Sequence, residues 1–69
     1  MNKYAIVIEK AERNYSAYAP DVPGCIATGD TPAEAEANIR IAVRLHLEGL
    51  RQDADQIPEG RSTADYIEV

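Results

Sequence analysis

The chain has 69 residues, a formal net charge of −5 and a sequence pI of about 4.6. An acidic surface repels phosphate and the few basic residues are scattered, so direct DNA binding is not expected. Cys25 is the only cysteine, which excludes an internal disulfide and a thiolate metal cluster. No apolar run reaches the length of a membrane helix and no signal peptide is visible, so a cytoplasmic protein is expected.

The length predicts one domain, spanning residues 1–69. A domain of this size buries only about 60% of its unfolded surface. The chain therefore favours a homo-oligomer, a dimer or tetramer, or a partner that completes the core.

Alternating apolar residues predict three short strands in the first half of the chain, at residues 3–10, 15–19 and 25–28. The polar residues 11–14 predict a hairpin between the first two strands, which makes them antiparallel. Two prolines and Gly24 predict a compact, stiff loop at residues 20–24.

The clearest periodic pattern runs from Thr31 to about Asp53 and predicts an α-helix. Thr31 and Glu34 match a capping box, and Pro32 suits the first helical position. Ile41 and Leu45 lie off the main stripe, so the helix has more apolar surface than one small sheet needs. The stripe itself recurs at steps of three and four: Ala35, Ile39, Ala42, Val43, His46, Leu47 and Leu50.

Residues 64–69 alternate again and predict a final strand. The expected fold class is α+β with the order β-β-β-α-β. Because the helix returns the chain, the last strand is expected beside the first and parallel to it, in one mixed sheet with the helix on one face. The opposite face is expected to be uncovered, which again favours self-association or a partner.

One stretch carries a more specific pattern, YSAYAPDVPGCIATGDTPAE at residues 15–34. It resembles the HicB family of antitoxins from type II toxin–antitoxin pairs, and the flanking strands extend the resemblance over nearly the whole chain. The matching motif residues are Pro20, Asp21, Pro23, Gly24, Cys25, Gly29, Asp30, Thr31 and Glu34.

The resemblance implies a partial ribonuclease-H-like fold and a protein that binds and blocks a small RNA-cleaving toxin, HicA. Full-length members of that family also carry a C-terminal module that binds operator DNA. The sequence stops at Val69, just after the last predicted strand. Operator binding is therefore not expected from this chain.

A ribonuclease-like fold raises the alternative of a metal-dependent nuclease built from Asp21, Asp30, Glu34 and Glu36. Such a site needs carboxylates that converge on two metal ions. The middle of the first strand offers no acid, Asp30 is explained by the helix start, and Asp21 by a proline-flanked turn. Structural roles are favoured, and no catalytic residue, metal site or cofactor is expected.

Cys25 is weighed as a nucleophile, which would need an activating base. The only histidine, His46, lies on or beside the apolar stripe of the helix, where a partly buried packing role is favoured. Cys25 is expected to be a small buried apolar residue. The four tyrosines, Tyr4, Tyr15, Tyr18 and Tyr66, suit either an interface or cross-strand packing.

The preferred hypothesis is a non-enzymatic binding protein whose acidic surface covers the basic surface of a HicA-type toxin. The candidate contacts, chosen by charge, are Glu9, Glu12, Asp21, Glu36 and Glu48. The alternative is an orphan homo-oligomeric scaffold or a small-ligand-binding module that has no toxin partner.

Overall fold

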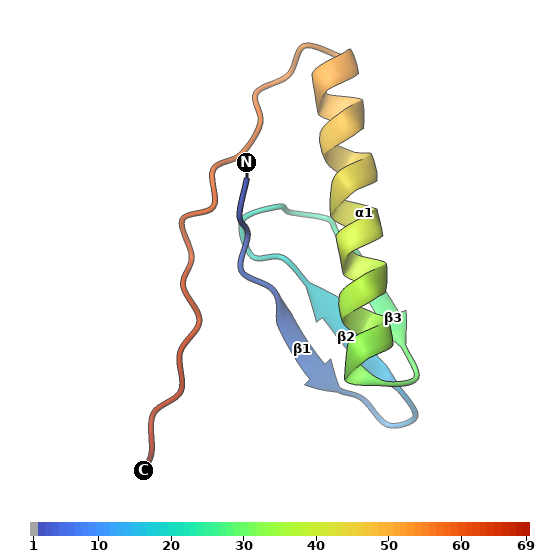
Figure 1. Ribbon diagram of the computed structural model, residues 1–69, viewed down its shortest axis with the longest axis vertical. Coiled ribbons are helices and arrows are strands. Elements are labelled where there is room, and N and C mark those ends of the chain that lie inside the picture. Colours follow the sequence, from blue (N-terminus) through green and yellow to red (C-terminus); the bar gives the residue numbers. More distant parts are fainter. Residues whose placement is uncertain (1) are drawn as a thin grey trace.

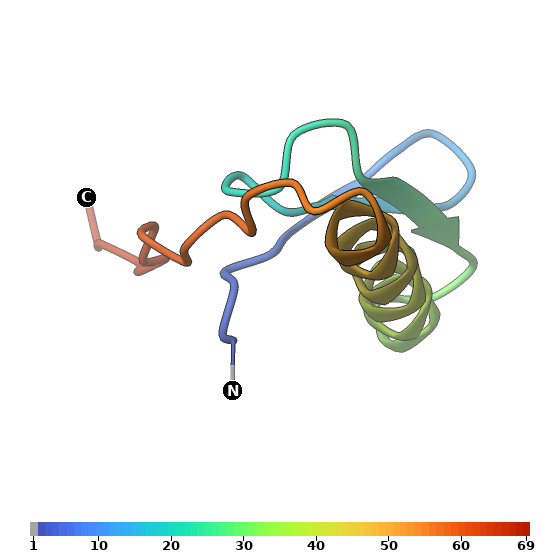
Figure 2. The same cartoon turned by 90° about the horizontal axis from the view of Figure 1, so that it is seen from above.

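The computed structural model describes residues 2–69 and contains one small sheet and one long helix. The strands are β1 (Val7–Lys10), β2 (Tyr15–Tyr18) and β3 (Ile26–Gly29), and the helix is α1 (Pro32–Gln52). The sheet is antiparallel in the order β1-β2-β3, and α1 lies across one of its faces (Figures 1 and 2). The predicted α+β class, with a single helix on one face, is confirmed.

Small side chains allow the helix to lie close to the sheet. Ile8 pairs with Ala17 and Ala17 with Ala27, so these three residues form a row across the sheet. Ala17 and Ala35 are fully buried, and Ile39 is buried between them and the rest of the core. A β-carbon on Gly29 would overlap the backbone nitrogen of Ala35. The first turn of α1 can therefore approach β3 only because residue 29 is glycine.

The start of α1 follows the predicted capping pattern. The Thr31 hydroxyl accepts a hydrogen bond from the Glu34 N–H at 3.1 Å. The Glu34 carboxylate accepts from the N–H of Asp30 at 2.9 Å, one residue earlier than in a standard capping box. Asn38 adds a hydrogen bond to the Thr28 carbonyl at 2.7 Å, which ties the second turn of the helix to β3.

The end of α1 is a Schellman motif. The N–H of Ala54 donates to Arg51, and the N–H of Asp55 donates to Leu50. Ala54 occupies the left-handed position of this motif with φ 56°, where glycine is the usual residue. The predicted helix limits are confirmed, with Thr31 and Asp53 as the two caps.

The limits of all three predicted strands differ from those observed, and β2 ends at Tyr18, one residue earlier than predicted. The first strand begins at Val7 rather than residue 3, since residues 3–6 have no strand opposite them. The reason lies in the register: Val7 pairs with Tyr18, so the residue opposite Ala5 would be Pro20, which has no N–H to donate. The third strand, β3, is shifted by one residue toward the helix.

The predicted strand at residues 64–69 is not formed. Residues 53–69 contain neither helix nor strand, so the described sheet is antiparallel and not mixed. A strand needs a second backbone to pair with, and the chain beyond Ser62 leads away from β1 in both views (Figures 1 and 2). Tyr66 and Ile67 are 96% and 86% exposed. Within residues 2–69, no helix combines the length and apolar character needed to cross a membrane.

Candidate protein-binding site

The proline-flanked loop between β2 and β3 is held by two turns. Val22 donates its N–H to Ala19, and Cys25 donates to Val22. Gly24 has φ 87°, a conformation that only glycine adopts easily. These turns direct Val22 and Cys25 into the core. The side chain of Asp21 remains on the outside.

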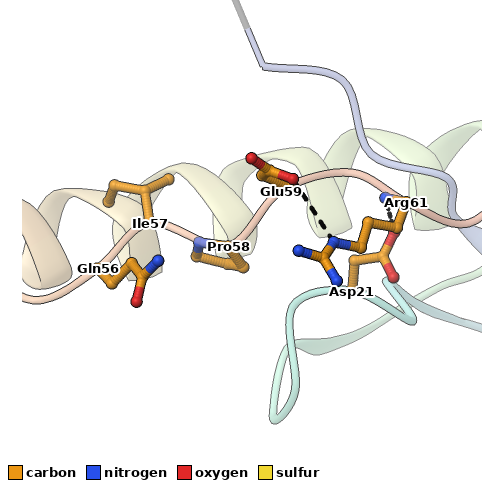
Figure 3. Close-up of a pocket in the computed structure, with 6 residues that line it drawn as sticks. All are labelled: Asp21, Gln56, Ile57, Pro58, Glu59 and Arg61. Carbon is orange, nitrogen blue, oxygen red and sulfur yellow. Dashed lines mark hydrogen bonds and ion pairs between the residues drawn. The ribbon is translucent and has the colours of Figure 1, made fainter.

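Asp21 binds a segment forty residues further along the chain. Its carboxylate accepts a hydrogen bond from the backbone N–H of Arg61 at 2.7 Å (Figure 3). It also accepts from the backbone N–H of Ser62 at 2.7 Å and from the Ser62 hydroxyl at 2.8 Å. The backbone and hydroxyl bonds from Ser62, followed by the Arg61 N–H, lower the pKa of Asp21. A shallow crevice of about 420 Å³ runs beside this contact and is lined by Asp21, Gln56, Ile57, Pro58, Glu59 and Arg61.

The hydrogen bonds from Arg61 and Ser62 to Asp21 are called the Asp21 clamp below. Two further contacts fix the segment that leads to this clamp. The Tyr4 hydroxyl donates to the Pro58 carbonyl. Gly60 lies so close to the backbone of Lys3 that a β-carbon would overlap its carbonyl oxygen. The chain from Pro58 to Ser62 is therefore attached to the body of the domain. The motif residue Asp21 was predicted, but Arg61 and Ser62 were missed, because their main contribution is a backbone N–H that has no sequence pattern.

The acids weighed for a nuclease site have separate structural partners. Asp21 holds Arg61 and Ser62, Glu34 accepts from the Asp30 N–H, and Glu36 pairs with Arg40 at 3.3 Å. Among residues 2–69 there is no group of three or more histidine, cysteine or acidic side chains arranged to hold a metal ion. In this arrangement the carboxylates stabilise a loop and the helix.

Cys25 is buried, as predicted, and its sulfur lies 4.0 Å from the Ala42 carbonyl oxygen. Burial raises the pKa of the Cys25 thiol, which is the opposite of what activates a nucleophile. The predicted packing role of His46 is wrong, because its side chain is exposed. The buried stripe of α1 is narrower than expected and repeats every four residues: Ala35, Ile39, Val43 and Leu47.

The charge-based candidate contacts do not form one cluster. Glu9 and Glu12 are exposed at the β1–β2 hairpin, at the same end of the molecule as the start of α1, which carries Glu36 (Figure 1). Glu48 is exposed near the other end of α1. Asp21 lies beyond the end of β2, also away from the hairpin, with its carboxylate bound to the C-terminal segment.

The face of the sheet opposite α1 carries an apolar row. The register places Val7, Tyr18 and Ile26 side by side across the three strands. Ile26 is 70% exposed and Tyr18 is partly exposed. Ile41 and Leu45 form a second exposed apolar pair, on α1, as expected from their positions off the main stripe. Exposed apolar surface of this kind is typical of proteins that bind other proteins.

A family model described as "HicB_like antitoxin of bacterial toxin-antitoxin system" matches residues 4–69. The chain belongs to the HicB-like antitoxin family. The match includes the proline-flanked loop, the capped helix start and the C-terminal segment that Asp21 holds. The resemblance inferred from the sequence is confirmed.

Two relatives and a chain of a solved structure are similar to this chain over most of its length. An uncharacterized 14.9 kDa protein of Haemophilus phage HP1 is 41% identical over 93% of this chain, and the chain spans 48% of that protein, about half its length. A UPF0150 protein of Thermoplasma acidophilum is 38% identical over 97% of this chain and 96% of its own length. A chain in a structure of the "HicA3 and HicB3 toxin-antitoxin complex" superposes with a TM-score of 0.72 and 30% identity, covering 87% of this chain and 70% of that one.

Proposed function

We propose that this HicB-like chain is a non-catalytic antitoxin domain that binds a small, basic, RNA-cleaving toxin of the HicA type and covers its RNA-binding surface. The observation that supports this most strongly is the similarity, over 87% of the chain, to a chain of a toxin–antitoxin complex. Binding inside a bacterial or archaeal cytoplasm, without a cofactor, is part of the same proposal.

The acidic character of the chain supports the proposed recognition of a basic toxin. The chain carries a net charge of −5, and opposite charges steer two proteins together and help to exclude other partners. Glu9 and Glu12 are exposed at the hairpin, and Glu36 lies on the same end of the molecule. We propose these three as the primary toxin contacts. Glu48 and Asp21 are proposed as secondary contacts, since Asp21 already holds Arg61 and Ser62.

The first experiment is to purify the untagged protein from its native cell. The mass of the purified species is then measured by light scattering and intact mass spectrometry. A complex with a second, small basic chain supports the proposal and supplies the toxin for binding assays. A chain that never co-purifies with one, and that fails to bind the product of any neighbouring toxin-sized gene, would contradict it.

The charge model is tested with the double reversal Glu9→Lys and Glu12→Lys. We expect toxin affinity to fall by about tenfold to a hundredfold and its dependence on salt to become flatter, measured by calorimetry at two ionic strengths. The matched control is Asp53→Lys with Asp55→Lys, which changes the net charge equally at the far end of α1, where both residues are exposed. Equal losses in both variants would show that only the total charge matters and would remove the hairpin from the model.

An orphan homo-oligomer is the second candidate, and it is favoured by the exposed row of Val7, Tyr18 and Ile26. The two candidates differ in what the native purification contains. A toxin complex predicts two different chains, whereas the orphan scaffold predicts copies of one chain only.

A further inference from the structure

The C-terminal tail, residues 63–69, extends from the molecule and forms neither helix nor strand. Every residue in it is exposed, and it runs away from the sheet and the helix (Figures 1 and 2). Its alternation places Asp65, Ile67 and Val69 on one side and Tyr66 and Glu68 on the other. An exposed segment with this alternation can form a strand when it pairs with another backbone.

The same molecule offers an open site with matching properties. A groove of about 640 Å³ lies between the helix and residues 2–6, the segment that leads into β1; we call it the β1–α1 groove, although no residue of β1 itself lines it. Tyr4 and Ile6 line it from the segment that precedes β1. From the helix side it is lined by Ile39, Val43 and Leu47, together with Glu36, Arg40 and Arg44. Within residues 2–69, no strand pairs with the outer edge of β1 beside it.

The tail and the groove are complementary in charge and in length. Lys3, Arg40 and Arg44 make the rim of the groove basic, and Glu36, the one acid there, is already paired with Arg40. The groove side of the tail presents one acid, Asp65, with two apolar residues, Ile67 and Val69. Seven residues of extended chain span about 23 Å. The helical stretch that lines the groove, Glu36 to Leu47, rises about 17 Å, so the tail is long enough to cover it.

The clamp at Asp21 decides which groove the tail reaches. Three hydrogen bonds hold Arg61 and Ser62 against the loop after β2, and Gly60 lies tightly against Lys3. From this fixed point the chain leads outward and not back along its own β1 (Figures 1 and 2). A tail fixed at its base and free beyond it is arranged to pair with a neighbouring molecule.

We propose that two copies of this chain exchange their C-terminal tails. Each tail adds as a fourth strand to the free edge of β1 in the partner copy, with Ile67 and Val69 in the partner's β1–α1 groove and Asp65 beside its basic rim. Because the two exchanges are identical, they form a closed, two-fold symmetric dimer. The exchange also supplies the strand that the sequence predicts at residues 64–69 and that a single copy does not form.

The first test is light scattering on the full chain and two variants that add the same charge. The unmodified chain is expected to be a dimer. Ile67→Asp places a charge in the groove and is expected to raise the dimer dissociation constant by about a hundredfold. Ala64→Asp places the same charge on the other side of the strand and is expected to have less than about a fifth of that effect. Both residues are exposed in the single chain, so circular dichroism should show an unchanged fold.

The second test decides whether the tail crosses to another copy. One sample carries Ile67→Cys and a second carries Arg44→Cys; the two are unfolded together, refolded and oxidised. Because each chain has only one introduced thiol, a disulfide between the two positions must join two copies, and the native thiol, Cys25, is buried. Mass spectrometry of the digested product is expected to find this cross-copy bridge.

Three results would overturn the exchange. The first is a monomer in light scattering whose tail is protected from hydrogen exchange only after a basic toxin is added, which would assign the groove to the toxin. The second is a dimer that Ile67→Asp leaves intact. The third is an Ile67→Cys, Arg44→Cys double variant that closes its bridge within one chain, which would show that the tail fills its own groove.

Discussion

At the scale of single residues, Asp21 connects two parts of the chain that are distant in sequence. It lies in a stiff loop between two strands, yet its carboxylate holds backbone N–H groups forty residues away. A carboxylate that accepts several such bonds is stabilised in its ionised form. In this chain the residue has a structural role: it fixes the point at which the C-terminal tail leaves the domain.

The pKa of Asp21 is lower in the folded chain than in the unfolded chain, mainly because of the bonds from Ser62. The anchoring therefore contributes stability above the ordinary aspartate pKa of about 3.9, and this contribution is lost as the pH falls through the lowered folded-state value. We expect the amide signal of Ser62 in NMR spectra to be constant down to about pH 4 and to shift below it.

The matched control for this titration is Asp21→Asn, which keeps the shape of the side chain but cannot ionise. Its Ser62 amide should exchange faster with solvent at neutral pH and should lose the acid transition. A Ser62 transition that persists in Asp21→Asn, or that is centred above the ordinary aspartate value, would contradict the assigned role.

At the scale of elements, the helix was the most predictable part of the chain and the tail the least. The limits of α1 follow from Thr31, Glu34 and Pro32, which act on backbone groups within one turn, so a local pattern is sufficient. The strands depend on what lies opposite them, and Pro20 shortens β1 although it is remote in sequence. The exposure of His46 depends on how narrow a stripe this small sheet can cover.

In the candidate site, too, the features set by local sequence were predictable and those set by the fold were not. The motif identified the family and pointed to Asp21, but its partners Arg61 and Ser62 are linked to it only through the fold. The apolar row of Val7, Tyr18 and Ile26 follows from strand register, which alternation alone does not determine. Surface acids such as Glu9 were found from charge, and charge alone does not place them together.

Two glycines test whether the local backbone conformation determines how a substitution by alanine changes the free energy of unfolding. Gly24 and Gly49 both have open space where a β-carbon would be added, so the backbone conformation is the main difference. Gly49 lies inside α1, and Gly49→Ala is expected to increase the free energy of unfolding by about 1 kcal/mol. Gly24 has φ 87°, and Gly24→Ala is expected to decrease it by about 1–2 kcal/mol. Urea unfolding measures both, and shifts of the same sign would contradict this account.

At the scale of the whole molecule, the fold leaves several large apolar side chains exposed, as expected for a chain of 69 residues with a small core. Three separate exposed surfaces remain: the tail, the row on the open face of the sheet, and the pair Ile41 and Leu45 on α1. Tail exchange covers the first of these. The other two remain available for the toxin, and so do Glu9 and Glu12 at the hairpin. Glu36 is the one proposed toxin contact that also lines the groove filled by the tail.

Tail exchange makes the thermal stability of the domain depend on its concentration. Dissociation accompanies unfolding in such a dimer, so dilution favours the unfolded chain and lowers the Tm. We expect the Tm to rise by several degrees over about a hundredfold increase in protein concentration, measured by calorimetry or circular dichroism. Ile67→Asp should have a lower Tm with no concentration dependence, whereas Ala64→Asp should retain the dependence. A Tm of the unmodified chain that is the same at every concentration would mean that the single copy is the stable unit, and the exposed tail would then need a different partner.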